Sequence, residues 1–99
     1  VMGPCILLND KDIDYNDLKL STKINGEIRQ ENSTKNMILP VNKMIENLSE
    51  VMTLKKGTII ATGTPSGVGM AFNPPRFLKK DDKIEMKIEK IGVLKNIVR

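Results

Sequence analysis

The range 18–31 holds the pattern that most restricts how this chain can fold. From Leu18 to Ile24, apolar or β-branched side chains occupy every second position, which is the period of a strand with one buried face. Asn25-Gly26 follows, and both central residues of a type I′ turn need the positive φ that these two residue types tolerate. The range therefore predicts an antiparallel hairpin, in which Leu18–Ile24 pairs with Glu27–Glu31 through Asn25-Gly26.

A second stretch, Pro40–Met52, has the periodicity of a helix. Its apolar side chains recur at steps of three and four residues, with polar side chains between them. Pro40 is acceptable in the first turn, where the amide would have no intrahelical acceptor. We expect an amphipathic helix here, followed by a turn at Lys56-Gly57 in which Gly57 takes a positive φ.

Four further segments are predicted as strands. Cys5–Leu8 is a short apolar run, Thr58–Thr62 is rich in β-branched residues, Ile84–Ile88 alternates with charged residues, and a last strand passes through Ile97-Val98 after a turn near Gly92. One helix among about six strands predicts an α+β fold that is mostly β.

The core is expected where the helix meets the sheet. Burial of a large aliphatic side chain contributes about 1.5–3 kcal/mol, so the apolar face of one helix would dominate the stability of so small a unit. The residues that we expect to pack together are Met44, Ile45, Leu48, Val51 and Met52 on the helix and Ile59, Ile60, Met86 and Ile88 on the sheet.

Composition excludes several classes of function. The 99 residues carry a net charge of +4, but lysines alternate with acidic residues and aromatic content is only 3%, which does not favour nucleic-acid binding. With no histidine and one cysteine, Cys5, the chain offers neither Ser-His nor Cys-His catalysis and no internal disulfide. No apolar run is long enough to span a membrane and no signal-peptide pattern is present, so a cytoplasmic location is expected.

Two stretches are candidate ligand sites. The acidic residues Asp10, Asp12, Asp14 and Asp17 are spaced like a calcium loop, but the glycine and glutamate that such a loop needs are missing, which predicts a solvated loop. The range 63–69 has three glycines and two hydroxyl side chains, so its backbone amides can approach an anion closely. It lacks the Gly-Lys-Ser/Thr ending of a P-loop and the glycine spacing of a dinucleotide site, so an ordinary structural turn is the alternative.

Several phrases of the sequence, taken in order, resemble the C-terminal half of the fumarylacetoacetate hydrolase family, close to its acylpyruvate hydrolases and 2-hydroxyhepta-2,4-diene-1,7-dioate isomerases. The resemblance implies that residues 1–99 are the C-terminal portion of such a catalytic domain, a mixed β-roll or sandwich with one main helix packed on it. The phrases are Asn25-Gly26-Glu27 with Arg29-Gln30, Met37-Ile38, Leu54-x-x-Gly57, Thr62-Gly63-Thr64-Pro65-Ser66-Gly67-Val68-Gly69, Pro74-Pro75-x-Phe77-Leu78-Lys79 and Ile91-Gly92-x-Leu94-x-Asn96.

The resemblance also implies a chemistry. Family members bind Mg²⁺ or Mn²⁺ through a Glu-x-Glu pair and a later Asp, which precede a Gly-Pro like Gly3-Pro4; a His and Glu lid and a basic Lys also lie upstream. None has a counterpart here, so no catalytic or metal-binding residue is assigned and the isolated chain is expected to be inactive. Gly63 and Thr64 match positions that hold the substrate carboxylate. The metal chelates an oxo-acid and stabilises an enolate-like intermediate, which serves C–C hydrolysis, decarboxylation and isomerisation alike.

The full-length protein is accordingly expected to be a homodimer that acts on a small oxo-acid. Three positions depart from the family pattern: Asp81 and Lys90 stand where glycine is favoured, and Thr58 where aspartate is usual. Aspartate tolerates positive φ, so the turn at Asp81 is expected to survive. Two other readings remain: a small basic β-domain that binds RNA or a protein partner, and a structural or dimer-forming module.

Overall fold

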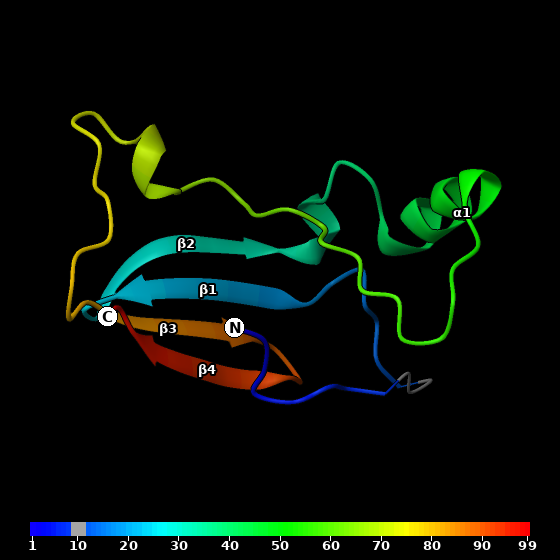
Figure 1. Ribbon diagram of the computed structural model, residues 1–99, viewed down its shortest axis with the longest axis horizontal. Helices are drawn as coiled ribbons and strands as arrows, with labels where there is room; N and C mark the ends of the chain where they lie inside the picture. Colours follow the sequence, from blue (N-terminus) through cyan, green and yellow to red (C-terminus); the bar gives the residue numbers. More distant parts are fainter. Residues whose placement is uncertain (9–11) are drawn as a thin grey trace.

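A computed structural model describes residues 1–8 and 12–99 of the chain. These residues form one four-stranded antiparallel sheet, one α-helix and two short 3₁₀ helices, which confirms an α+β fold that is mostly β (Figure 1). The spatial order of the strands is β2-β1-β3-β4. In chain order the elements are β1 (Lys19–Ile24), β2 (Glu27–Ser33), η1 (Thr34–Asn36), α1 (Val41–Val51), η2 (Gly69–Ala71), β3 (Lys83–Ile88) and β4 (Gly92–Ile97).

The predicted hairpin is confirmed as β1 and β2. Ile24 pairs with Glu27, and the two loop residues Asn25 and Gly26 have φ values of 51° and 85°, as a type I′ turn requires. The ladder is interrupted once: Thr22 pairs with Gln30 but Lys23 pairs with Ile28. The residue left between these pairs is Arg29, so β2 carries a β-bulge, a feature that bends a strand and redirects its side chains.

The two faces of the sheet differ in chemistry. Thr22, Met86 and Leu94 are neighbours across β1, β3 and β4 and define the apolar face. The next row along the strands is Lys23, Glu85 and Lys95, and it defines the charged face, where Lys95 Nζ lies 3.0 Å from Glu85 Oε2. Because Gln30 is the partner of Thr22, its side chain belongs to the apolar face.

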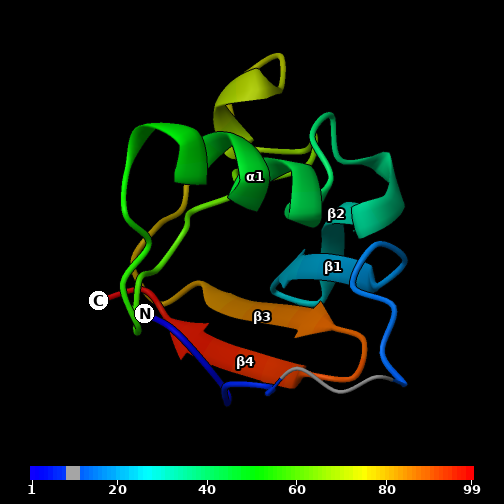
Figure 2. The same cartoon turned by 90° about the vertical axis from the view of Figure 1, so that its right-hand side faces the viewer.

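The predicted helix is confirmed, but its predicted burial is wrong. Ile45, Val51 and Met52 are exposed, and Met44 and Leu48 are only half-buried. Figures 1 and 2 show that α1 lies on the β2 side of the sheet, far from β4. The three-four periodicity correctly identified an apolar face, but a periodicity does not say which surface covers that face.

On the sheet side, the expected packing partners of the helix are also poorly covered. Ile59 is 70% exposed, Ile88 is exposed, and Ile60 and Met86 are half-buried. Leu18 is the one buried apolar residue in the described part of the chain.

Two predicted strands are absent from the described residues. Cys5–Leu8 and Thr58–Thr62 join no sheet, so the count is four strands in residues 1–8 and 12–99 instead of about six. β-branched composition favours a pleated and half-buried surface, and it yields a strand only where a neighbouring strand is available. The turn predicted before Thr58–Thr62 is confirmed, since Gly57 has a φ of 86°.

The turns that flank β3 place non-glycine residues in the left-handed region. Asp81 has a φ of 71°, so the turn expected there is confirmed, and Lys90 has a φ of 66°. The side chain of Asp82 accepts hydrogen bonds from the Lys79 amide and from Asn25 Nδ2, both at 2.8 Å. These bonds fasten the β1–β2 turn to the beginning of β3. In the described ranges, no helix has the length and apolar character needed to cross a membrane.

Candidate functional site

Gly63 and Thr64 lie in an irregular segment that returns from α1 along β2 (Figure 1). Both are exposed, and the segment before them is not the buried strand that we expected. Their proposed role in carboxylate binding therefore depends on how the glycine loop, residues 63–69, is held against β2.

One side chain of β2 anchors the beginning of the glycine loop. Gln30 Nε2 lies 2.8 Å from both Thr64 Oγ1 and the carbonyl oxygen of Pro65. A backbone carbonyl can only accept hydrogen bonds, so the group that faces Pro65 must be the NH₂ of Gln30. The same NH₂ therefore donates to Thr64 Oγ1. The Thr64 proton is not used in this contact and stays available to a second acceptor.

The remainder of the glycine loop fits closely against backbone. Gly67 has a φ of 103°, and a Cβ atom added there would collide with the carbonyl oxygen of Arg29, the bulge residue. A Cβ added at Gly69 would collide with the carbonyl oxygen of Arg76, whose amide donates to the Gly69 carbonyl at 2.8 Å. Glycine at both positions lets the loop lie directly on its neighbours.

A cluster that we call the arginine clasp fixes the far end of the loop; it consists of Glu27, Arg29, Phe72 and Arg76. The guanidinium carbons of Arg29 and Arg76 lie 4.9 and 5.2 Å from the centre of the Phe72 ring. Arg76 donates two hydrogen bonds to Glu27, at 2.8 and 2.6 Å, and Arg29 Nη2 donates to the Arg76 carbonyl at 3.0 Å. Cation–π contacts and a bidentate ion pair both favour a fixed geometry.

Electrostatics in the clasp follow from this pairing. The hydrogen bonds from Arg76 hold the pKa of the Glu27 carboxyl below its ordinary value, and the same contact raises the pKa of Arg76. The side chain of Arg29 is only 10% exposed, and its Nε atom has no hydrogen-bond partner among the described residues.

Sequence reasoning gave no role to Gln30 or to the clasp. Arg29-Gln30 was part of the resemblance, but strand periodicity predicts only which face a side chain occupies. The bulge at Arg29 reverses that expectation locally, and no signal within residues 27–31 marks it. Contacts with Thr64 and Arg76 span 34 and 47 residues, beyond any local pattern.

The residues described here do not fit a divalent metal ion. Within the described ranges, no three His, Cys, Asp or Glu side chains gather closely enough to hold one. Asp10, one of the four acidic residues considered above, lies outside those ranges. The expectation that Mg²⁺ or Mn²⁺ is bound by residues upstream of Gly3-Pro4 stays a prediction.

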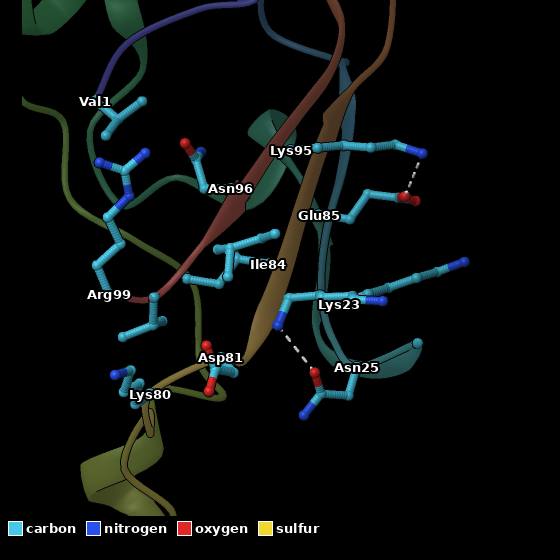
Figure 3. A pocket seen from close by; sticks show the side chains of 14 residues that line it. Val1, Lys23, Asn25, Lys80, Asp81, Ile84, Glu85, Lys95, Asn96 and Arg99 are labelled. Atoms are coloured by element: carbon cyan, nitrogen blue, oxygen red, sulfur yellow. Dashed lines mark hydrogen bonds and ion pairs between the residues drawn. The ribbon is translucent and has the colours of Figure 1, made fainter.

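A broad hollow of about 1260 Å³ lies near the two termini. Figure 3 shows that Glu85 and Lys95 point to one side of β3, whereas Val1, Asn96 and Arg99 lie on the other side. Its polar groups therefore do not converge on a common point. Neither Gly63 nor Thr64 lines this hollow or a smaller one of about 560 Å³ over β1 and β2.

Comparison with known proteins identifies the class. The sequence profile of the fumarylacetoacetate (FAA) hydrolase C-terminal family matches residues 1–99, so the chain belongs to this family. The chain is 48% identical over 95 residues to the oxaloacetate tautomerase YisK of Bacillus subtilis. This alignment covers 96% of the chain but only 32% of that relative.

Solved structures agree in fold. A probable 2-hydroxyhepta-2,4-diene-1,7-dioate isomerase from Mycobacterium abscessus superposes with a TM-score of 0.90 and is 37% identical, covering 98% of this chain and 37% of that one. Maleylpyruvate hydrolase from Sphingobium sp. SYK-6 gives a TM-score of 0.85 at 36% identity, covering 97% and 34%. The chain thus spans about a third of the length of these relatives.

Proposed function

We propose that this chain supplies the carboxylate-binding loop of a divalent-metal enzyme that acts on small oxo-acids or diacids through a metal-stabilised, enolate-like intermediate. The observation that carries the proposal is the anchoring of the glycine loop by Gln30, because it leaves the Thr64 hydroxyl as a positioned donor. The three relatives named above are a tautomerase, an isomerase and a hydrolase, and the substrates in their names are small oxo- or hydroxy-diacids.

The proposed chemistry of the loop is recognition of an anion. A hydroxyl and neighbouring amides donate hydrogen bonds to a carboxylate without adding a charge that would compete with a metal. In this proposal Gly63 contributes its amide and Thr64 its hydroxyl, while Mg²⁺ or Mn²⁺ and the proton-transferring groups come from parts of the full-length protein outside this chain. Those parts would also decide between tautomerisation, isomerisation, decarboxylation and C–C hydrolysis.

The test is Thr64→Val in the full-length enzyme, assayed with oxaloacetate. Valine keeps the shape of threonine but removes a hydrogen bond to a charged group, which contributes about 1.5–3 kcal/mol, so kcat/KM should fall roughly ten- to over a hundredfold. Thr53→Val, at an exposed position after α1, is the matched control and should leave kcat/KM within about twofold. Unchanged turnover in a folded Thr64→Val enzyme would remove Thr64 from the site.

Metal dependence is tested separately. Full-length protein treated with a chelator should lose turnover and regain it with Mg²⁺ or Mn²⁺. Full activity after complete metal removal would contradict the metal-dependent part of the proposal and leave the role of the loop intact.

A further inference from the structure

We propose that Gln30 is a positioning residue that sets the direction in which the Thr64 hydroxyl donates its hydrogen bond. The inference rests on the proposed function, because it concerns the same carboxylate-binding loop. Gln30 touches no substrate in this proposal; it acts through Thr64, and its bond to the Pro65 carbonyl fixes the orientation of its own amide.

The contacts of the Gln30 amide fix its polarity. Its Nε2 meets one obligatory acceptor, the Pro65 carbonyl, and one group that can either donate or accept, the Thr64 hydroxyl. The contact with Pro65 identifies the group as the NH₂ of Gln30, which can only donate, so Thr64 Oγ1 accepts a hydrogen bond from Gln30. Within the described ranges, no hydrogen bond is donated by the Thr64 hydroxyl.

The bond from Gln30 restricts the direction in which the Thr64 hydroxyl can donate. A free threonine hydroxyl rotates among staggered positions and can donate to water or to nearby carbonyls. When its oxygen is held by Gln30, the proton is directed away from β2, towards the exposed side of the loop. Gln30 itself is half-buried on a strand of the sheet, so the donor direction is set by a rigid element and not by the loop alone.

Two substitutions separate the polarity of the anchor from its shape. Gln30→Met has a similar length but removes the donor, and it should lower kcat/KM about three- to tenfold, the effect of losing one neutral hydrogen bond. Gln30→Glu reverses the polarity of the contact, because an ionised carboxylate can only accept a hydrogen bond. The Thr64 hydroxyl would then donate to that carboxylate and would no longer be available to the substrate. It should lower kcat/KM at least about tenfold near pH 8.

The pH profile of Gln30→Glu gives a readout that a merely structural role would not move. Protonation of the new carboxyl restores one donor and removes a negative charge next to the anion site. The ratio of kcat/KM for Gln30→Glu to that of the wild type should therefore rise as pH falls towards 5, whereas the ratio for Gln30→Met should stay flat. A flat ratio for both variants would overturn the inference.

A double-mutant cycle in the full-length enzyme decides whether Gln30 acts through Thr64. In the Thr64→Val background, Gln30→Met should cost less than about twofold, because the donor that it positions is gone. Glu31→Gln is the matched control: it is the next residue on β2, exposed and on the opposite face, and should change kcat/KM by less than about twofold. Folding of every variant is checked by circular dichroism and thermal unfolding.

The outcomes distinguish the two proposals. If Thr64→Val lowers kcat/KM but Gln30→Met does not, or if Gln30→Met costs the same in both backgrounds, the role of Gln30 is wrong and the carboxylate loop stands. If Thr64→Val itself has no effect, the proposed function of the loop is wrong.

Discussion

Gly67 is the residue at which the geometry of the glycine loop depends most directly on the absence of a side chain. Its φ of 103° lies in the region that L-residues rarely adopt, and a Cβ atom would also meet the Arg29 carbonyl. Backbone cannot move aside as a flexible side chain can. We expect Gly67→Ala to lower the free energy of unfolding of the full-length protein by more than about 2 kcal/mol and to reduce kcat/KM, because the loop must shift.

Gly57→Ala is the matched control for this prediction. Gly57 has a similar φ of 86°, but an added Cβ there meets no atom within 4 Å, so only the cost of the left-handed backbone remains, about 1–2 kcal/mol. The difference between the two variants in the free energy of unfolding separates the collision of the Cβ atom with the Arg29 carbonyl from the strain of the left-handed backbone. Both free energies are obtained from denaturant midpoints and slopes. Equal losses for the two variants would mean that the contact between Gly67 and the bulge does not constrain the loop.

Residue-level features were predicted well where a single residue type determines the backbone. Asn25, Gly26 and Gly57 adopt the positive φ that their chemistry permits. The partners of Gln30 and Arg29 were not predicted, because a glutamine or arginine side chain can form hydrogen bonds with many groups. Which group lies within reach depends on the tertiary fold.

At the scale of elements, the turn between β3 and β4 contains a strained residue that can be relieved. Lys90 has a φ of 66°, which costs a lysine about 1–2 kcal/mol relative to glycine. Glycine loses more chain entropy on folding, by about 0.5–1 kcal/mol. The difference between these two ranges is about 0–1.5 kcal/mol, so Lys90→Gly should raise the free energy of unfolding by roughly 0.7 kcal/mol, measured by denaturant unfolding of the full-length protein.

Lys87→Gly, three residues earlier and exposed on β3, should have the opposite sign. Glycine within a strand loses entropy without relieving any strain and costs roughly 0.5–1 kcal/mol. A loss of stability in both variants would show that the Lys90 side chain contributes to folding in a way that its backbone conformation does not reveal.

Elements were predicted correctly where a neighbouring strand, or the hydrogen bonds of the helix itself, were available to pair the backbone. The β1–β2 hairpin and β3 were expected from alternation, and α1 was expected from three-four spacing. The last strand was expected through Ile97-Val98 after a turn near Gly92, and it is observed as β4, Gly92–Ile97. Each strand pairs with a neighbouring strand, and the helix forms its own backbone hydrogen bonds. Thr58–Thr62 has the composition of a strand but no adjacent strand, so composition alone misled. The glycine loop was recognised from its glycines, and its role in carboxylate binding stays a prediction. Its anchor on β2 could be seen only in the three-dimensional arrangement.

As a whole, the chain has a larger solvent-accessible surface than a compact domain of its mass. The chain exposes 8197 Å², whereas a compact monomer of 11.1 kDa exposes about 5,700 Å². Its radius of gyration is 15.3 Å, against about 13 Å for a compact domain of this length. The excess agrees with the exposed apolar face of α1, and with a chain that spans about a third of its relatives.

This surface leads to a prediction about α1. An isolated helix of 11 residues is only marginally stable in water, and most helical stability in proteins comes from packing of the apolar face. We expect α1 to exchange its amide hydrogens rapidly in the 99-residue chain alone, and at least about a hundredfold more slowly in the full-length protein, where other parts would cover Ile45, Val51 and Met52. β1 and β3, in the middle of the sheet, serve as the internal reference and should exchange more slowly than α1 in the isolated chain. Hydrogen exchange followed by mass spectrometry measures both forms under the same conditions. Equal protection of α1 in the two forms would mean that its apolar face needs no further partner.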